Sequence, residues 1–354
     1  MCGAMDPYGY HSEPQRLREW QGPLLEVEGL YLEFRTRSGV VKALNGVSYH
    51  VAAGETLAIL GESGSGKSVS AQAIMGLLET PPAYVTGGAI RYRGEDLLTA
   101  SAEERRQARG KEISMIFQDA LSALNPVFPV GWQIAETLRI RRGMSKQQAL
   151  ARAADLMDLV RIPAARQRLR DYPHQFSGGM RQRVMIAMAL ALDPPVLIAD
   201  EPTTALDVTV QAQIMELLVE LQRERNMALI LITHDLGVIA DVADRIAVMY
   251  AGRIVEHADV YSLYAAPGHP YTRGLLESLP RLDLKGHELT TIPGLPPNLM
   301  AIPSGCPFHP RCRFAQQICF DQVPDDHLLS GSRAEWRTSK CHFAEEIAQL
   351  PVPR

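Results

Sequence analysis

Apolar and polar positions alternate along two stretches near the start of the chain, residues 24–34 and 40–51. Gly39 and Gly46 interrupt this alternation. A period of two is typical of half-buried strands and glycines between strands mark turns, so the pattern predicts a small antiparallel sheet. Residues 1–23 are polar and show no period, which predicts a disordered tail before the sheet.

Three further apolar runs have the length of buried strands. They are residues 55–60, 196–199 and 228–233. The first run leads through a glycine-rich loop into a predicted helix from Lys67, whose apolar face includes Leu77 and Leu78. An amphipathic helix is predicted at about residues 208–225, between the second and third runs. Strands that alternate with helices in this way are typical of a parallel α/β sheet.

A further amphipathic helix is predicted to begin after Ser145. Ser145 and Gln148 have the spacing of a capping box, in which each side chain accepts a hydrogen bond from the other residue's backbone N–H. Apolar residues then recur on one helical face, at Ala149, Ala153, Leu156, Met157 and Val160. The region from about residue 267 to the end differs, because it is rich in proline and shows little period. We expect a separate extension there, held by something other than a large apolar core.

Composition narrows the class of protein. The 354 residues, 46% hydrophobic and 21% charged, indicate a globular chain of two or three domains and argue against disorder, collagen-like repeats and coiled coils. The 36 basic and 40 acidic residues nearly cancel, so no overall basic field indicates nucleic acid. The apolar stretches are shorter than the roughly 18–20 residues that cross a bilayer, and residues 1–22 lack the apolar segment of a secretory signal. We therefore expect a soluble, intracellular chain.

The loop at Gly61–Ser68 carries the clearest chemical signal. Its sequence, Gly-Glu-Ser-Gly-Ser-Gly-Lys-Ser, fits the phosphate-binding pattern G-x-x-x-x-G-K-S/T. Its predicted phosphate-binding residues are Gly61, Ser63, Gly64, Ser65, Gly66, Lys67 and Ser68. Lys67 is expected to bridge the β- and γ-phosphates of a nucleotide, and the Ser68 hydroxyl to bind Mg²⁺. A glycine-rich turn that binds nothing is the alternative, but the apolar strand before the loop and the helix after it favour a phosphate site.

Two acidic residues, Asp200 and Glu201, follow the apolar run at residues 196–199. Ligands bind at this edge of a parallel α/β sheet, so Asp200 is expected to hold Mg²⁺ and Glu201 to polarise the attacking water. An acidic pair by itself is more often a solvated helix cap. Its occurrence together with the phosphate loop is the reason to assign this pair a role in catalysis. His234, at the end of the third run, is either a structural residue or a contact to the γ-phosphate.

The tract Phe176–Arg183 resembles the signature loop of ABC-type ATPases, with Met180 where glutamine is more usual. Its Ser177, Gly178 and Gly179 would present helix N-terminal N–H groups to the ATP of a partner subunit. Other landmarks of that family follow in order. Gln118 resembles the glutamine of the Q-loop, residues 204–207 with Asp207 resemble the D-loop, and His234 resembles the switch histidine.

The resemblance covers roughly residues 24–285 and implies an α/β fold. We expect an ABC ATPase domain over residues 24–285 with a mixed parallel core sheet, an antiparallel β subdomain and a helical subdomain at about 119–192, followed by an irregular Cys- and Pro-rich extension over 286–354. Two such domains would sandwich two ATP molecules, and Glu201, His234 and Gln118 would be the catalytic residues. Gln118 would also bind Mg²⁺. Phe34, with Tyr31 as a competitor, would stack on adenine.

Four cysteines lie in the extension, with the spacing C-x5-C-x6-C-x21-C. They are Cys306, Cys312, Cys319 and Cys341. Disulfides are rare in intracellular proteins, so ligation of a 4Fe–4S cluster is favoured. A mixed Zn²⁺ site with His309 or His342, and four unligated buried thiols, are the alternatives.

Short sequence motifs around these cysteines are similar to the C-terminal extension of ATP-binding subunits of bacterial dipeptide/oligopeptide importers. They are His269–Thr272, Pro293–Pro297, Gly305–Cys306 and Pro310–Cys312. This resemblance implies an iron–sulfur cluster on the four cysteines and an ATP hydrolase that powers peptide import. The implied partners are two membrane permeases that contact residues 122–126, an extracytoplasmic peptide-binding protein and a second, distinct ATPase subunit. The chain would lie on the cytoplasmic face of the plasma membrane and bind no nucleic acid.

Two alternatives to peptide import stay open. The same machinery would import another small solute, such as a nickel chelate, since cargo is chosen by other subunits. A soluble ABC ATPase without a transporter is less favoured, because the chain carries one cassette, no coiled coil and this particular extension. Whether two copies of this chain or two different subunits form the ATP sandwich also stays open.

Overall fold

The structure is a computed structural model, and it describes residues 20, 22–204, 206–278, 291–329 and 337–351. The predicted tail at residues 1–23 lies almost entirely outside the described residues. The strands are β1 Leu25–Thr36, β2 Gly39–Val51, β3 Thr56–Leu60, β4 Ala83–Tyr92, β5 Glu95–Asp96, β6 Ile113–Ile116, β7 Val196–Asp200, β8 Ala228–Thr233, β9 Arg245–Tyr250, β10 Arg253–Asp259, β11 His327–Leu328 and β12 Thr338–Ser339.

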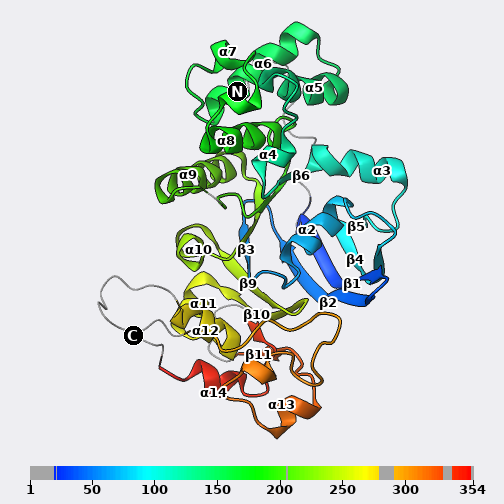
Figure 1. The fold of residues 1–354 in the computed structure, drawn as a ribbon, viewed down its shortest axis with the longest axis vertical. Coiled ribbons are helices and arrows are strands. Elements are labelled where there is room, and N and C mark those ends of the chain that lie inside the picture. The colour runs from blue at the N-terminus through cyan, green and yellow to red at the C-terminus, as the bar shows by residue number, and fades with distance from the viewer. Residues whose placement is uncertain (1–19, 21, 205, 279–290, 330–336, 352–354) are drawn as a thin grey trace.

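Helices connect these strands and cover the sheets (Figure 1). They are α2 Lys67–Met75, α3 Ala102–Gln107, α4 Ala120–Ala123, α5 Val130–Arg142, α6 Lys146–Leu159, α7 Ala165–Arg168, α8 Gly178–Ala189, α9 Val208–Arg225, α10 Leu236–Val242, α11 Val260–Ala265, α12 Pro270–Glu277, α13 Gln317–Asp321 and α14 Ala344–Ala348. The short turns η1 Ala108–Glu112, η2 Pro173–Gln175 and η3 His309–Arg311 complete the set.

The central sheet has the strand order β11-β12-β10-β9-β3-β8-β7-β6 within the described residues. Strands β9, β3, β8, β7 and β6 are parallel, and β10 and β12 add on antiparallel. Every residue of β3, β7, β8 and β9 is buried, as expected for parallel strands covered on both faces. The predicted strand at residues 228–233 is confirmed at both ends, and that at 196–199 is one residue longer, because Asp200 still pairs with β8.

A second sheet of order β2-β1-β4-β5 packs beside the central one (Figure 1). Its first two strands are the predicted antiparallel pair. The expectation that Gly46 marks a turn is wrong. Strand β2 continues through Gly46, where φ is +82° and the pairing with β1 shifts register, so this glycine makes a bulge. Leu57 and Ile59 of β3 face this second sheet, while Ala58 and Leu60 face the opposite side.

Helices α5 to α8 gather at one end of the molecule (Figure 1). The predicted capping box is present, with Gln148 N donating to Ser145 Oγ and Ser145 N donating to Gln148 Oε1. The predicted apolar face of α6 is fully buried, in an apolar cluster that also contains residues of α5, α8 and α9. Together with the two sheets, this helical part confirms the predicted fold class.

Helix α2 is shorter than the apolar spacing predicts. It ends at Met75, because Gly76 adopts a left-handed C-cap with φ +56° that closes the last turn. Leu77 therefore lies outside the helix and is half exposed. The prediction relied on apolar spacing alone and therefore extended the helix beyond Gly76, the residue that ends it.

The C-terminal extension lies against the core at the end opposite to α5–α8 (Figure 1). Strand β12 pairs with β10, so the extension continues the central sheet at its edge. Cys306, Phe308 and Cys319 of the extension join one apolar cluster with Tyr250 and Tyr271 of the ATPase part. The extension is thus held partly by core packing. Of the helices described, none is long and apolar enough to span a bilayer.

Candidate nucleotide-binding site

The loop between β3 and α2 has a backbone conformation at Gly66 that only glycine tolerates. Gly66 is the N-cap of α2 with φ +109°, and a Cβ there would lie 2.7 Å from the Ala43 carbonyl oxygen. Gly64 has φ +78° and faces open space. These glycines let the loop turn sharply so that the start of α2 faces the cavity beside it.

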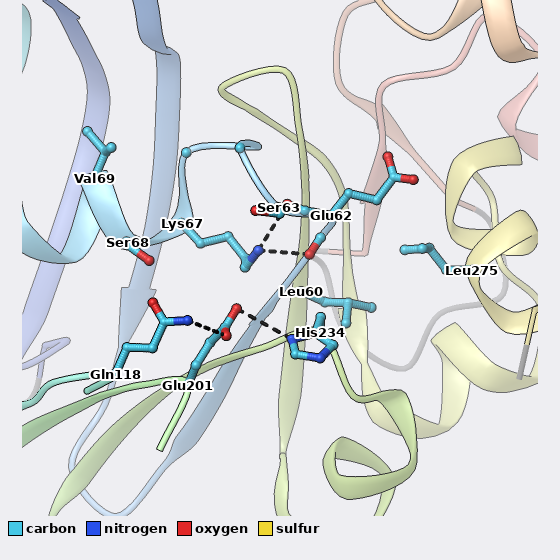
Figure 2. A pocket seen from close by; sticks show the side chains of 13 residues that line it. Leu60, Glu62, Ser63, Lys67, Ser68, Val69, Gln118, Glu201, His234 and Leu275 are labelled. Carbon is cyan, nitrogen blue, oxygen red and sulfur yellow. Dashed lines mark hydrogen bonds and ion pairs between the residues drawn. The ribbon is translucent and has the colours of Figure 1, made fainter. Parts of the chain in front are cut away.

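Lys67 is the buried cation of this loop. Its side chain folds back over the loop, and Nζ donates hydrogen bonds of 2.8 Å to the Gly61 carbonyl oxygen and 3.0 Å to that of Glu62 (Figure 2). Burial lowers the pKa of Lys67, while the nearby carboxylates of Glu201, Asp200 and Glu62 act against this shift. An ammonium held by two carbonyls can exchange them for phosphate oxygens, which are stronger acceptors.

Asp200 and Ser68 form the second polar pair. Ser68 Oγ donates a 2.9 Å hydrogen bond to Oδ1 of Asp200, the buried last residue of β7. Burial raises the pKa of Asp200, and the Ser68 hydrogen bond acts against this. A hydroxyl next to a buried carboxylate is an oxygen-donor set that suits Mg²⁺ together with nucleotide phosphates, so these residues fit the metal that the sequence predicts. Ser65 Oγ adds a buried polar atom without a hydrogen-bond partner on the same loop.

Glu201 is held by three side chains from three segments. Its Oε2 accepts hydrogen bonds from Gln118 Nε2 at 2.9 Å and from Thr204 Oγ1 at 2.8 Å. His234 Nδ1 lies 3.4 Å from Oε1 (Figure 2). Glu201 has φ +45°, an unusual conformation for a residue with a side chain. Strain of this kind is often kept where a side chain must be aimed, and here it aims the carboxylate at the loop.

Most of these residues surround one cavity of about 530 Å³, whereas Ser65, Asp200 and Thr204 lie behind its lining. Its lining within the described part of the chain is Leu60, Gly61, Glu62, Ser63, Gly64, Gly66, Lys67, Ser68, Val69, Gln118, Glu201, His234 and Leu275. The structure thus brings together the predicted loop and the three predicted catalytic residues, although they are up to about 170 positions apart in the sequence.

The predicted signature residues do not line this cavity as the structure describes it. Ser177 caps α8 by accepting a 3.3 Å hydrogen bond from Met180 N, and Asp207 caps α9 by accepting one from Val210 N at 3.0 Å. The two caps lie close together, because a Cβ on Gly179 would come 2.6 Å from Val210 Cγ1. The start of α8 and the start of α9 therefore lie side by side, and none of Ser177, Gly178, Gly179 and Asp207 lines the cavity at the phosphate loop.

Phe34 is partly buried against the apolar cluster between the two sheets. Neither Phe34 nor Tyr31 is among the described residues that line the cavity. The Tyr31 hydroxyl instead lies over Gly46, at 2.8 Å from an ideal Cβ position. The adenine-stacking role of Phe34 stays a prediction.

Two family models match the chain. The model described as ABC transporter matches residues 44–204, and the model described as oligopeptide/dipeptide transporter, C-terminal region, matches residues 255–319. The dipeptide transport ATP-binding protein DppD of Bacillus subtilis is 51% identical over 329 residues, which cover 93% of this chain and 97% of that protein. This chain belongs to the ATP-binding subunits of the ABC-type peptide transporter family. Members of this family hydrolyse ATP to drive transport.

Other relatives agree with this assignment. The oligopeptide transport ATP-binding protein OppD of Bacillus subtilis is 55% identical over 302 residues, covering 85% of this chain and 84% of that protein. OppD of Salmonella typhimurium is 53% identical over 308 residues, covering 87% and 91%. Among solved structures, the dimeric ATP-binding cassette MJ0796 in a post-hydrolysis state bound to ADP and Pi has a TM-score of 0.60 at 28% identity, covering 67% of this chain and 98% of that one.

The prediction of an iron–sulfur cluster or zinc site in this ABC subunit is wrong. In the part of the chain that the structure describes, no group of three or more His, Cys, Asp or Glu residues is arranged to hold a metal ion. The four predicted cysteines and the two histidines do surround one cavity, but its volume is only about 10 Å³. Burial raises the pKa of Cys312 to about 11 and that of Cys341 to about 12.

Three residues at the site were missed by the sequence analysis. Thr204 holds Glu201, Leu275 of α12 lines the cavity, and the Tyr271 hydroxyl accepts a 2.8 Å hydrogen bond from the backbone N–H of Glu62. Tyr271 lies within the motif at residues 269–272 and Leu275 follows it. The sequence analysis used this motif to identify the family and did not place it at the nucleotide. Only the fold brings α12 next to the phosphate loop.

Proposed function

We propose that this ABC subunit powers the import of short peptides by hydrolysing ATP bound on its phosphate loop. The observation that carries the proposal is the position of Glu201, which Gln118, Thr204 and His234 hold at the edge of the cavity that contains Lys67. A carboxylate fixed next to a phosphate site has the geometry of a base that activates water.

Each residue then has a defined task. Lys67 moves its hydrogen bonds from two loop carbonyls to the phosphate oxygens, and the N–H groups at the start of α2 bind the remaining oxygens. Ser68 and Asp200 would hold Mg²⁺, which neutralises phosphate charge when bound. Glu201 accepts the proton of the attacking water on a carboxylate oxygen, while Gln118 and Thr204 fix the direction of that carboxylate.

A second subunit completes the site in this proposal. Ser177, Gly178 and Gly179 of one subunit would contact the ATP held by the phosphate loop of the other. Support comes from their absence among the described residues that line the cavity of their own chain, and from the dimeric state named for the solved cassette MJ0796. The relatives DppD and OppD are named as dipeptide and oligopeptide transport proteins, which supports a peptide as cargo.

The proposed assembly contains two permeases, a second ATPase subunit and an extracytoplasmic peptide-binding protein. The chain would lie at the cytoplasmic face of the plasma membrane, where the permeases hold it. Leu121 and Val127 flank the predicted permease contact at residues 122–126, and both are more than 60% exposed. Exposed apolar side chains of this kind support a protein contact at this place.

Reconstitution of the whole transporter in proteoliposomes tests this function. We expect ATP hydrolysis to rise when di- to pentapeptides are added with the binding protein, and to stay at background in a transporter with Glu201→Gln. Stimulation by a nickel chelate and by none of the peptides would reject peptide import and favour the small-solute alternative. Purification of the chain from detergent-solubilised membranes without any permease would reject the transporter role.

A further inference from the structure

The phosphate loop contains an acidic side chain at a place where negative charge opposes the ligand. Glu62 directly follows Gly61, and its carbonyl oxygen holds Lys67. A carboxylate next to a triphosphate repels it, and it also competes for the lysine that must bind the phosphates. In Figure 2 the Glu62 side chain points away from Lys67. The structure shows what keeps it there.

Arg311, which is 249 positions further along the chain, binds this carboxylate with both arms of its guanidinium. Nη1 lies 2.6 Å from Oε2 of Glu62, and Nη2 lies 2.9 Å from Oε1. The side chain of Arg311 is 5% exposed and that of Glu62 is 27% exposed. Paired hydrogen bonds of this geometry are among the stronger side-chain contacts in proteins, and they fix both position and charge.

Arg311 is itself fixed by its surroundings. Its Nε donates a 2.9 Å hydrogen bond to the Pro293 carbonyl oxygen, and its guanidinium lies 5.8 Å from the centre of the Tyr250 ring. Tyr250, Tyr271 and Phe308 pack against each other with ring centres 4.7 to 5.4 Å apart. A preorganised guanidinium loses little conformational entropy when it holds the carboxylate.

The aromatic cluster around Arg311 makes a second contact with the phosphate loop, through Tyr271. The Tyr271 hydroxyl accepts the backbone N–H of Glu62, so main chain and side chain of this one residue are both held by groups outside the loop. On the outer side of the loop, Pro296, Pro297 and Leu299 of the extension line a small cavity together with Ser63 and Gly64. The extension therefore supports the phosphate loop directly.

We propose that Arg311 is a positioning residue for ATP, which neutralises Glu62 and holds its carboxylate away from Lys67 and the triphosphate. Through this contact, the C-terminal extension sets the nucleotide affinity of the subunit. The inference rests on nucleotide binding at the phosphate loop. Loss of nucleotide binding in the unmodified chain would remove that basis, whereas the variants below test Arg311 separately.

A double-mutant cycle on the full chain separates this role from a structural one. The variants are Arg311→Met, Glu62→Gln and the two combined, and the readout is the Kd for the β,γ-imido analogue of ATP with Mg²⁺, measured by calorimetry. We expect Arg311→Met to weaken binding by about tenfold or more, because the carboxylate is then released beside the phosphates. Glu62→Gln alone should bind at least as tightly as the unmodified chain.

The combined variant distinguishes an effect through the charge of Glu62 from a purely structural role of Arg311. If Arg311 acts through the charge of Glu62, the Glu62→Gln change restores binding in the Arg311→Met chain to within about threefold of the unmodified protein. Binding as weak as in Arg311→Met alone would show that arginine only supports the extension, and would overturn the proposal. Unchanged binding in Arg311→Met would overturn it as well.

A matched control comes from the same extension. Arg313 also pairs with a glutamate, Glu277, but outside the phosphate loop, and its side chain is 53% exposed. Arg313→Met should leave the Kd unchanged, and thermal unfolding of each variant checks that the chain is folded. In the assembled transporter, Arg311→Met should raise the KM for ATP while kcat changes less than about twofold, because the arginine acts on binding and touches no reacting atom.

Discussion

Gln118 Nε2 and Glu201 Oε2 lie 2.9 Å apart, which joins the end of β6 to the end of β7 across the mouth of the nucleotide cavity. Glu201 reaches this position with a left-handed backbone, so its direction is fixed both by its main chain and by its partner. The contact also links the segment that leads through α4 to the helical part to the residue proposed to activate water. Movement of that part would therefore reorient Glu201.

The first prediction concerns Glu201→Gln. The amide keeps the size and the hydrogen bonds of the carboxylate, but it cannot take a proton from water. We expect ATP turnover of the assembled transporter to fall by about 10²- to 10⁴-fold while ATP is still bound. Retention of radiolabelled ATP on a filter measures the second part. Glu216→Gln, on an exposed carboxylate of α9, is the control and should keep full turnover. Equal turnover in both variants would remove Glu201 from its role.

The second prediction concerns Lys67→Met. This change removes a buried ammonium whose two hydrogen bonds are available to phosphate oxygens. Charge-assisted hydrogen bonds contribute about 1.5–3 kcal/mol each, so ATP affinity should fall by about 100-fold or more. Calorimetric titration with MgATP measures this. Lys111→Met removes an exposed lysine and should bind ATP as before. A Kd within a few-fold of the unmodified chain in Lys67→Met would contradict the assigned role.

The third prediction concerns Gly179, where the signature meets α9. A Cβ at this position would lie 2.6 Å from Val210 Cγ1, and a β-branched side chain cannot easily move aside. Gly179→Ala should lower the free energy of unfolding by about 1–3 kcal/mol despite the better helix propensity of alanine. Combination with Val210→Ala should recover most of this loss.

Gly178→Ala is the matched control for the packing at Gly179. Its Cβ would meet Leu206 Cδ2 at 3.6 Å, an ordinary contact, so it should not destabilise the chain. Urea denaturation followed by fluorescence gives the free energies. If Gly178→Ala and Gly179→Ala cost the same, the close contact with Val210 is not the cause.

The fourth prediction concerns stability against pH. His269 is buried at the N-cap of α12, where its Nδ1 accepts a hydrogen bond from Tyr271 N, and burial lowers its pKa to about 3. The unfolded chain binds a proton on this residue near pH 6.5, but the folded chain does so only near pH 3. As pH falls from 6.5, the free energy of unfolding should therefore drop by about 1.4 kcal/mol per pH unit through this residue.

The variant His269→Asn isolates that contribution. Asparagine also caps helices but does not titrate, so the pH dependence of unfolding should become less steep by that amount. His257 is also buried, with its pKa lowered to about 3, and keeps its own share of the slope in the variant. An identical slope in His269→Asn and the unmodified chain would contradict this account.

Much of the ATPase part was predictable because its signals are local. Strand β8 and helix α9 have the predicted bounds, since apolar period and flanking turn residues lie within each segment. The phosphate loop could likewise be predicted from the sequence, because the residues that bind phosphate are adjacent in the chain. Gly76 shows the limit even of local signals, because a single left-handed glycine ended α2 where the apolar pattern continued.

The contacts of the extension were not predictable in the same way. The presence of four cysteines in a chain predicted to be intracellular favoured a metal site, but thiol burial and a cavity of about 10 Å³ result from packing that the sequence does not show locally. The pairing of β12 with β10 likewise depends on which sheet edge lies free after the core has formed.

The order of residues along the chain determined that this protein has a phosphate loop, an acidic strand end and a signature-like helix start. Each of these depends on neighbours a few positions apart, where backbone sterics and hydrogen bonding act directly. Tertiary structure alone decided that Thr204 holds Glu201, that Tyr271 takes a loop N–H, and that Arg311 binds Glu62. Such contacts join segments that are distant in sequence. They form only when burial of the sheet faces brings the strands, helices and loops that bear these residues together.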